Sequence, residues 1–365
     1  MDFEKLREKL LSNAAGRLFL AFAAFIYGLG VKFILFMYKK EWRQQKAVNS
    51  RVVCIGNITA GGTGKTTAAL LCATKLSRAG IRTAIVSRGY KRSKKKKEVV
   101  VLFDKDMLNW EESGDEPYMM SQMLAEDLVP VLVCSDRFAA AKEAVKQFRS
   151  QVILLDDGMQ HHRLKRDANI VLIDAVNPFG GKALLPLGTL REPLTALSRA
   201  SLVVITHSNL VNERTIEDIK DEIRIYNDEI NIITAIHKPD YYFDVNTKKK
   251  VALKDLKGEA VAFSAIGDHS SFEQTLKNLG LTLKQTWRFP DHSTYTIEQM
   301  ETFASSRGNL PLITTFKDFV KFPHGWQDII KDRLYILAIN MEILNGEEDK
   351  LLEVLYPSLG KKKKK

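Results

Sequence analysis

The sequence predicts an α/β protein in which helices cover both faces of a mostly parallel sheet. Continuously apolar runs of strand length recur along residues 83–236, and helical patterns lie between several of them. A glycine-rich segment joins an earlier apolar run to a helix, and a fresh alternation of strand and helix patterns begins near residue 258. The second alternation predicts a smaller α/β domain. The apolar runs are residues 83–86, 99–103, 129–133, 152–155, 170–173, 202–205 and 230–236.

The glycine-rich segment follows the apolar run 52–55 and predicts the phosphate-binding loop of a P-loop NTPase. The backbone N–H groups of such a loop surround phosphate oxygens, because glycine has no side chain in the way. Lys65 would then reach the β- and γ-phosphates, and the Thr66 hydroxyl would bind Mg²⁺. The usual pattern has glycine where this chain has Thr59, so a glycine-rich turn with a chance Lys-Thr pair is the alternative. The expected loop comprises Gly61, Gly62, Thr63, Gly64, Lys65, Thr66 and Thr67.

A chain of 365 residues is long enough for two domains of ordinary size. Its hydrophobic content of 45% with mixed charge indicates a folded protein. Cys54, Cys72 and Cys134 have no metal-binding spacing, which favours core residues in a reducing compartment. We expect an N-terminal apolar helix in residues 1–44, a nucleotide-binding domain in 45–238, a hairpin linker in 239–257, a smaller α/β domain in 258–356 and a basic tail in 357–365.

The N-terminal apolar segment and the lysine runs favour a membrane partner. Residues 18–31 carry no charge, and these fourteen residues are fewer than the about 20 that cross a bilayer. We therefore expect a helix lying on the membrane surface, with a spanning helix and a buried core helix as alternatives. The net charge is +11, of which the last five lysines supply five. The runs at 91–97 and 361–365 either attract phosphates or are a solvated loop and a disordered tail. They lack interleaved aromatic residues, so no nucleic-acid partner is expected.

Polar residues follow the apolar runs, at the edge where a parallel sheet gathers its ligands. Asp156 and Asp157 end one run, and a P-loop enzyme needs a carboxylate there to hold Mg²⁺. His161 and His162 are neighbours that point apart, so they suit hydrogen bonding or a positive charge near phosphate better than zinc. Arg191 lies in a loop and could bind a phosphate.

Two further motifs with titratable residues are expected in loops. Gly114-Asp115-Glu116-Pro117 predicts a helix start with Asp115 as N-cap and Pro117 at the first helical position. His292 lies in a loop of the smaller domain, where a lone histidine is usually a solvated surface residue. If His292 faces the strand ends of the first domain, it could take or relay a hydroxyl proton.

Taken together, these segments resemble the tetraacyldisaccharide 4′-kinase family, the lipid A kinases of Gram-negative bacteria. The resemblance covers nearly the whole chain and includes several independent motifs in the same order. The family carries its own Gly-Asn-x-Thr version of the loop, which accounts for Thr59. The segments that carry the resemblance are the N-terminal apolar helix and residues 56–66, 87–90, 114–117, 156–161, 188–193 and 291–292.

The resemblance implies transfer of the γ-phosphoryl group of ATP, with Mg²⁺, to the 4′-hydroxyl of a tetraacylated glucosamine disaccharide 1-phosphate. It implies that Asp115 and His292 activate this hydroxyl, and that Thr66, Asp156 and Asp157 serve the metal. The implied partners are the lipid and the cytoplasmic face of the bacterial inner membrane, and no obligate protein partner is inferred. The residues implied to line the cleft are Asn57, Glu116, Arg137, Gln160, His161, Arg191 and Glu192.

The sequence departs from the family pattern at a few positions. Ala265 replaces a glycine in residues 263–267, Phe316 stands at a position often held by glutamate, and Thr67 stands where proline is frequent. These differences concern details of the smaller domain and of the loop rather than the reaction. A membrane-associated regulatory P-loop NTPase is the alternative function, and such a switch would have a lysine at position 60, where this chain has Ala60.

Overall fold

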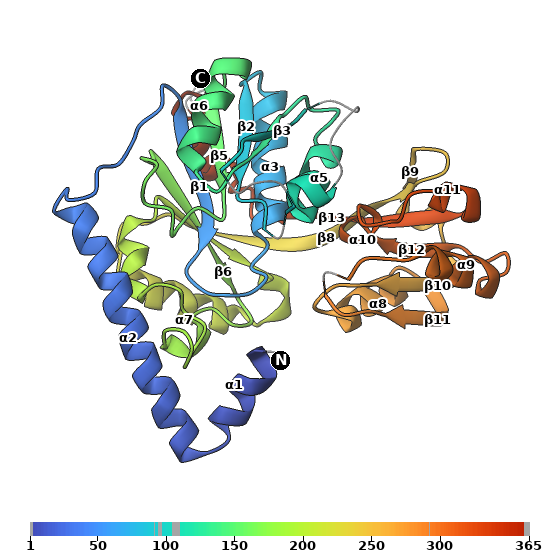
Figure 1. The fold of residues 1–365 in the computed structure, drawn as a ribbon, viewed down its shortest axis with the longest axis horizontal. Helices are drawn as coiled ribbons and strands as arrows, with labels where there is room; N and C mark the ends of the chain where they lie inside the picture. Colours follow the sequence, from blue (N-terminus) through green and yellow to red (C-terminus); the bar gives the residue numbers. More distant parts are fainter. Residues whose placement is uncertain (1–2, 91, 94–96, 104–109, 292, 361–365) are drawn as a thin grey trace.

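A computed structural model describes residues 3–90, 92–93, 97–103, 110–291 and 293–360 (Figure 1). His292 and the tail at 361–365 therefore lie outside the described residues. The described strands form a thirteen-stranded sheet in the order β11-β10-β12-β13-β8-β7-β6-β1-β5-β2-β4-β3, and β9 pairs with β8. In the first lobe these strands are β1 (Arg51–Asn57), β2 (Thr83–Ser87), β3 (Val100–Leu102), β4 (Val131–Val133), β5 (Val152–Asp156), β6 (Ala168–Asp174) and β7 (Leu202–Thr206).

The first lobe is a parallel sheet with β3 as an antiparallel edge strand. Successive residues of β1 enter two different apolar cores: Val53 and Ile55 lie in one, and Val52 and Cys54 in the other. A strand buried on both faces has to be apolar throughout, which explains the continuous runs in the sequence. Helix α3 (Lys65–Arg78) covers one face and α6 (Arg137–Phe148) covers the other. The predicted fold class is thus confirmed.

The remaining helices are short, except at the N-terminus. They are α1 (Phe3–Leu11), α2 (Ala14–Lys39), α4 (Trp110–Ser113), α5 (Asp115–Met123), α7 (Glu213–Arg224), α8 (His269–Asn278), α9 (Ile297–Ser306), α10 (Phe316–Phe319), α11 (Trp326–Ile329), α12 (Glu348–Leu355) and α13 (Pro357–Gly360). The second lobe contains β10 (Gly258–Ser264), β11 (Leu281–Arg288) and β12 (Leu312–Thr315), with α8 to α11 around them.

A two-stranded ribbon joins the lobes. Strand β8 (Ile232–Asp244) begins parallel to β7 and then pairs antiparallel with β13 (Leu334–Ile343) from Ala235 to Asp244. Its far end also pairs with β9 (Lys249–Ala252), so the hairpin expected in residues 239–257 belongs to a longer connection. Figure 1 shows β8 running from the first lobe into the second. Each lobe is therefore tied to the other through β8 and β13.

The C-terminal helix α12 returns to the first lobe. Leu351 and Leu355 lie in the same apolar core as Val53, and the Arg51 guanidinium donates to the carbonyls of Val354 and Leu355 at 2.8 and 3.0 Å. The sequence pattern assigned residues up to 356 to the smaller domain. In the structure, α12 packs with the first lobe instead, because its apolar face completes the core over β1.

Helix α2 is longer than the uncharged run suggested. The helix is 26 residues long in total and includes Lys32, because lysine is compatible with a helix interior. Asn13 caps its start by accepting from the Gly16 N–H at 2.7 Å. The buried positions Gly16, Leu20, Ala24 and Gly28 recur every four residues, so one narrow stripe contacts the protein while the rest of the apolar surface is exposed.

A candidate phosphate site at the carboxyl edge of the first lobe

The glycine-rich loop leaves β1 and enters α3 in the geometry that a phosphate loop requires. Gly61 and Gly64 have φ values of +123° and +82°, in the region that favours glycine. At Gly64 a Cβ would also lie only 2.5 Å from the His237 ring. The loop is fixed from the other side, since the Ala60 N–H donates to the Thr189 carbonyl at 2.7 Å. The N–H groups at the start of α3 then face the edge where β1 and β5 end.

Asp156 and Asp157 lie beside this loop because β5 is the parallel neighbour of β1, with Ile55 paired to Asp156. The Asp156 carboxylate is 4% exposed and accepts from the Ser87 hydroxyl at 3.1 Å. Burial raises the pKa of Asp156 to about 7, and the nearby carboxylates of Glu116 and Asp157 add to the shift. Below about pH 7 the side chain is therefore protonated in the absence of a cation.

Asp157 is the shared partner of two cations. Lys65 Nζ lies 3.9 Å from its Oδ1, and an Arg191 guanidinium nitrogen lies 2.9 Å from the same atom. Burial lowers the pKa of Lys65, whereas the Asp157 charge opposes this shift. The two positive charges of Lys65 and Arg191 exceed the single negative charge of Asp157, so this group of three side chains can attract a phosphate.

The residues around the loop fit a magnesium nucleotide. Both polar atoms of the Asn57 side chain, and the Thr63 hydroxyl, are buried without a hydrogen-bond partner in the part of the chain that the structure describes. Such atoms need a ligand or water to satisfy them. In the described residues no three His, Cys, Asp or Glu side chains gather as a metal site. A cation here would therefore use the Thr66 hydroxyl, the two aspartates and phosphate oxygens, which are the ligands that Mg²⁺ prefers.

A polar wall continues the site toward α6 and the 188–193 loop. The Gln160 amide donates to Glu192 Oε1 at 3.1 Å and to the Asn57 carbonyl at 3.3 Å, and Arg199 forms an ion pair with the buried Glu192. Arg137 is 6% exposed, and burial lowers its pKa, with the neighbouring Arg88 as the next cause. The predicted cleft residues of the first lobe thus lie around one edge of the sheet.

The two adjacent histidines are neutral rather than cationic. Burial lowers the pKa of His161 to about 4, and the charge of Arg137 lowers it further. Burial also lowers the pKa of His162 to about 4, followed by the effect of Arg166. Burial first, and then the nearby arginines, thus favour neutral rings over the cations that the sequence left open. Hydrogen bonding near phosphate stays a prediction.

Asp115 begins α5 but does not cap it. Gly114 precedes it with φ +97°, Asp115 Oδ1 accepts from the Glu116 N–H at 2.9 Å, and Pro117 is the third helical residue rather than the first. Glu116 is close enough to Lys65 and Asp156 to affect the pKa of both. The two acids therefore lie at the same edge as the loop.

The whole chain is similar to proteins of one enzyme family. The family model described as tetraacyldisaccharide-1-P 4′-kinase matches residues 16–359. The chain belongs to this kinase family. A tetraacyldisaccharide 4′-kinase from Elusimicrobium minutum is 57% identical over 98% of this chain and 96% of its own length, and one from Aquifex aeolicus is 30% identical over 91% and 96%. The crystal structure of LpxK from Aquifex aeolicus in complex with ATP is 27% identical, with a TM-score of 0.74, over 96% of this chain and 100% of that chain.

Sequence reasoning missed one contact of the kinase loop, His237. The Thr67 hydroxyl donates to the Gly64 carbonyl at 2.8 Å, so its oxygen is left to accept from His237 Nε2, also at 2.8 Å. Burial lowers the pKa of His237 to about 4, and His207, whose ring centroid is 4.5 Å away, is the next cause. His237 lies on β8, so the interlobe ribbon contacts the start of α3. Nothing in the sequence around this single histidine predicted its contact with Thr67.

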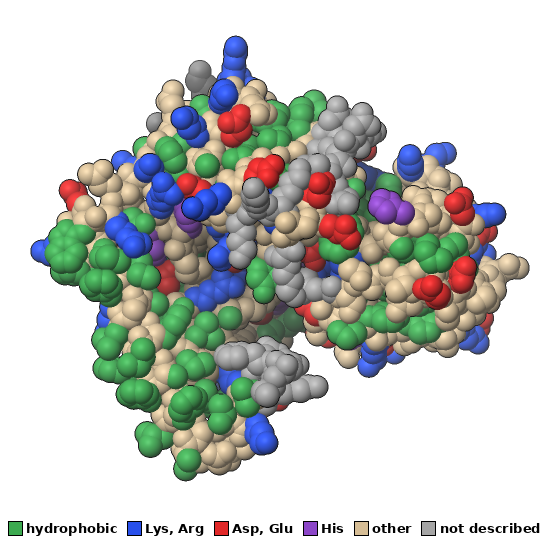
Figure 2. All heavy atoms as spheres, viewed as in Figure 1, with side chains coloured by type: hydrophobic (Ala, Val, Ile, Leu, Met, Phe, Trp, Pro, Cys, Tyr) green, Lys and Arg blue, Asp and Glu red, His purple; other side chains and the backbone are tan. Residues whose placement is uncertain are grey.

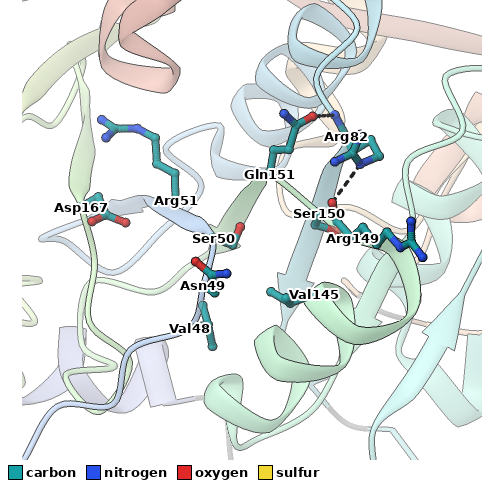
Figure 3. Close-up of a pocket in the computed structure, with 10 residues that line it drawn as sticks. All are labelled: Val48, Asn49, Ser50, Arg51, Arg82, Val145, Arg149, Ser150, Gln151 and Asp167. Carbon is teal, nitrogen blue, oxygen red and sulfur yellow. Dashed lines mark hydrogen bonds between the residues drawn. The ribbon is translucent and has the colours of Figure 1, made fainter.

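A separate cavity of about 620 Å³ lies at the opposite, amino-terminal edge of the kinase sheet (Figure 3). Three arginines line it, and two of them donate hydrogen bonds to backbone carbonyls. Arg51 donates to a carbonyl of α12, and Arg82 Nε donates to the Arg149 carbonyl at 2.9 Å. The cavity is therefore a structural junction, remote from the phosphate loop.

Proposed function

We propose that this chain phosphorylates the 4′-hydroxyl of a tetraacylated glucosamine disaccharide 1-phosphate in lipid A biosynthesis, using ATP. The observation that carries the proposal is the loop at 61–67 beside Asp156, Asp157 and Arg191, in a chain that matches the 4′-kinase family over residues 16–359. ATP with Mg²⁺ supplies the transferred phosphoryl group and neutralises the charge that develops during transfer.

The residues of the first lobe bind and orient the triphosphate. The loop amides and Lys65 hold the phosphates, while Thr66, Asp156 and Asp157 hold the cation. Lys65 is now 3.9 Å from Asp157, so it can exchange this contact for phosphate oxygens with little movement. Arg191 stays paired with Asp157 and adds positive charge at the same edge. Because phosphoryl transfer depends mainly on positioning and charge, this arrangement suits the reaction.

The acceptor hydroxyl is activated by Asp115 and His292 acting as a pair. Asp115 is at the start of α5, at the edge where Glu116 meets Lys65 and Asp156. His292 follows Asp291 in the sequence and lies outside the described residues. The imidazole would take the hydroxyl proton and the carboxylate would orient the ring, as general-base pairs do.

The lipid reaches the site from the membrane along α2. This helix is the one described element that is long and apolar enough to cross a membrane, and only 17% of its most apolar window is buried. Figure 2 shows hydrophobic side chains gathered along it. Its large exposed hydrophobic residues are Leu18, Phe19, Phe22, Phe25, Ile26, Tyr27, Leu29, Phe33, Ile34 and Phe36. We infer attachment to the cytoplasmic face of the bacterial inner membrane, with the basic residues near its ends at the lipid headgroups.

Helix α2 also contacts the loop that carries Arg191. The Tyr27 hydroxyl donates to the Arg191 carbonyl at 2.8 Å, and the Arg7 guanidinium of α1 donates to the Pro186 and Leu187 carbonyls at 3.0 and 3.1 Å. A lipid held at α2 would therefore present its sugar head next to the phosphate site. This contact supports a single path from bilayer to active site.

Incubation with labelled ATP and the disaccharide lipid tests the proposed reaction. We expect label in the lipid, dependent on Mg²⁺ and on intact Lys65. ATP hydrolysis at the same rate with and without lipid, and no labelled lipid, would favour the regulatory NTPase instead.

Replacing exposed aromatic residues of α2 tests the membrane contact. The triple variant Phe22→Ser, Phe25→Ser, Phe33→Ser keeps the buried stripe, and should cosediment less with anionic phospholipid vesicles. Ile225→Ser provides a matched control, because Ile225 is 71% exposed on the first lobe but lies outside α2. Equal sedimentation of all three proteins would argue against α2 as the membrane contact.

A further inference from the structure

The second lobe contains a buried lysine that the proposed reaction does not use. Lys321 is 2% exposed, and its ammonium nitrogen has no hydrogen-bond partner within the described ranges. An ammonium removed from water without compensation costs several kcal/mol in practice. A lysine retained in such a place needs a counter-charge nearby.

Asp318 supplies only part of that compensation. Its carboxylate is fully buried and lies 3.8 Å from Lys321 Nζ, beyond hydrogen-bonding distance. The Asp318 oxygens accept instead from the Ala265 N–H at 2.9 Å, the Tyr295 hydroxyl at 3.0 Å and the Thr315 hydroxyl at 2.7 Å. Asp318 is thus satisfied by neutral donors that fix the end of β12, and Lys321 is left with attraction at a distance.

Charges from both lobes act on Lys321, and the one from the first lobe is Asp115. Burial lowers the pKa of Lys321, the carboxylates of Asp318, Asp115 and Asp291 oppose this shift, and Lys317 adds to it. Lys317 is itself paired with Asp291 at 2.9 Å. The helix α10, which carries Lys317 and Asp318, packs against α5, and α5 begins at Asp115. The ammonium of Lys321 therefore lies on the side of the second lobe that meets Asp115.

We propose that Lys321 is a positioning residue for the kinase reaction, whose buried charge holds the Asp115 carboxylate in place across the boundary between the lobes. The inference rests on the proposed role of Asp115. Asp115 lies on the first lobe and Lys321 on the second, so their separation depends on how the lobes meet. A fixed positive charge on the second lobe, on the side that meets Asp115, favours the lobe position in which this carboxylate stays at the phosphate edge. It also favours the ionised carboxylate, which the pair requires.

A double-mutant cycle separates this role from a structural one. Lys321→Met keeps the size of the side chain but leaves the buried Asp318 carboxylate without its nearby cation, so its Tm should fall, and kcat is compared per folded protein. We expect kcat to fall about tenfold or more, because small misplacements of a catalytic group have effects of this size, with an unchanged Kd for ATP. In the Asp115→Asn background, which has lost the carboxylate charge, the same substitution should change kcat less than about twofold.

Lys331→Met provides the control, since Lys331 is exposed on the same lobe, and it should leave kcat unchanged. The inference is overturned if Lys321→Met lowers kcat by the same factor in both backgrounds, or if the loss of kcat only follows a loss of folded protein. A different result, wild-type kcat in Asp115→Asn itself, would contradict the proposed function of Asp115 on which the inference depends.

Discussion

Each lobe holds a lysine–aspartate pair with almost the same separation, and the two pairs differ in everything around them. Lys65 and Asp157 are 3.9 Å apart with side chains 14% and 38% exposed, whereas Lys321 and Asp318 are 3.8 Å apart with side chains 1% and 0% exposed. In the first lobe, Asp157 also binds Arg191, so Lys65 remains available to a ligand. In the second lobe, solvent cannot stabilise the ammonium, and its energy depends on the surrounding carboxylates.

The two lysine–aspartate pairs have similar separations but different degrees of burial, and the difference in burial determines what each pair can do. A partly exposed pair beside a phosphate loop can open at low cost, because water and ligand replace the contact. A buried pair cannot open without leaving a charge uncompensated, so it fixes the position of what surrounds it. We therefore assign ligand exchange to Lys65 and positioning to Lys321.

Lys65→Ala should have the largest effect on the first-lobe pair. Without the ammonium, the triphosphate loses a direct contact and Asp157 loses one of its two cations. We expect kcat/KM for ATP to fall by about 10³-fold or more, in the range seen when electrostatic stabilisation of a transferring group is removed. Initial rates with varied ATP measure this. A change smaller than tenfold would mean that Lys65 does not exchange Asp157 for phosphate.

Asp156→Asn tests how burial of a carboxylate in the first lobe makes stability depend on pH. Burial, with Glu116 and Asp157, raises the pKa of Asp156 from its ordinary 3.8 to about 7. Between these values the folded protein holds a proton that the unfolded chain releases, so the free energy of unfolding falls as pH rises across this window. In nucleotide-free protein, Asp156→Asn should therefore raise Tm at pH 8 by about 2–4 °C and change it little near pH 4. An equal change at both pH values would contradict the raised pKa.

His237→Ala should have the smallest of these effects. It removes one neutral hydrogen bond to Thr67, which predicts an about three- to tenfold weaker affinity for ATP. Isothermal titration with a non-hydrolysable ATP analogue measures the affinity directly. The control is His324→Ala, because His324 is exposed on the second lobe and distant in sequence from the loop. An unchanged affinity would show that the interlobe ribbon does not fix the loop.

Local pattern predicted most of the first lobe. Parallel strands buried on both faces have to be apolar throughout, and glycine must occupy positions such as Gly64, where φ is positive and His237 leaves no space for a Cβ. Topology then brought Asp156 beside the loop, because β1 and β5 are parallel neighbours. These features follow from short stretches of sequence and one rule about sheet edges.

What the sequence did not reveal depends on contacts between distant segments. The pairing of β8 with β13 joins residues about a hundred positions apart, and it decides both the interlobe ribbon and the contact of His237 with Thr67. Lysine is ordinarily exposed, so nothing local marked Lys321 as buried. The length of α2 was underestimated, because Lys32 breaks an apolar run without breaking a helix.

The proposed reaction requires Asp115 to act in the chemistry rather than in nucleotide binding. The direct measurement is a single-turnover phosphorylation of the disaccharide lipid by Asp115→Ala, with the Kd for ATP determined on the same preparation. We expect the rate to fall by about 10²–10⁴-fold, as for loss of a general acid–base group, while the Kd for ATP stays within twofold of the wild-type value. Loss of ATP binding in this variant, or a wild-type rate of lipid phosphorylation, would contradict a role of Asp115 in the chemistry.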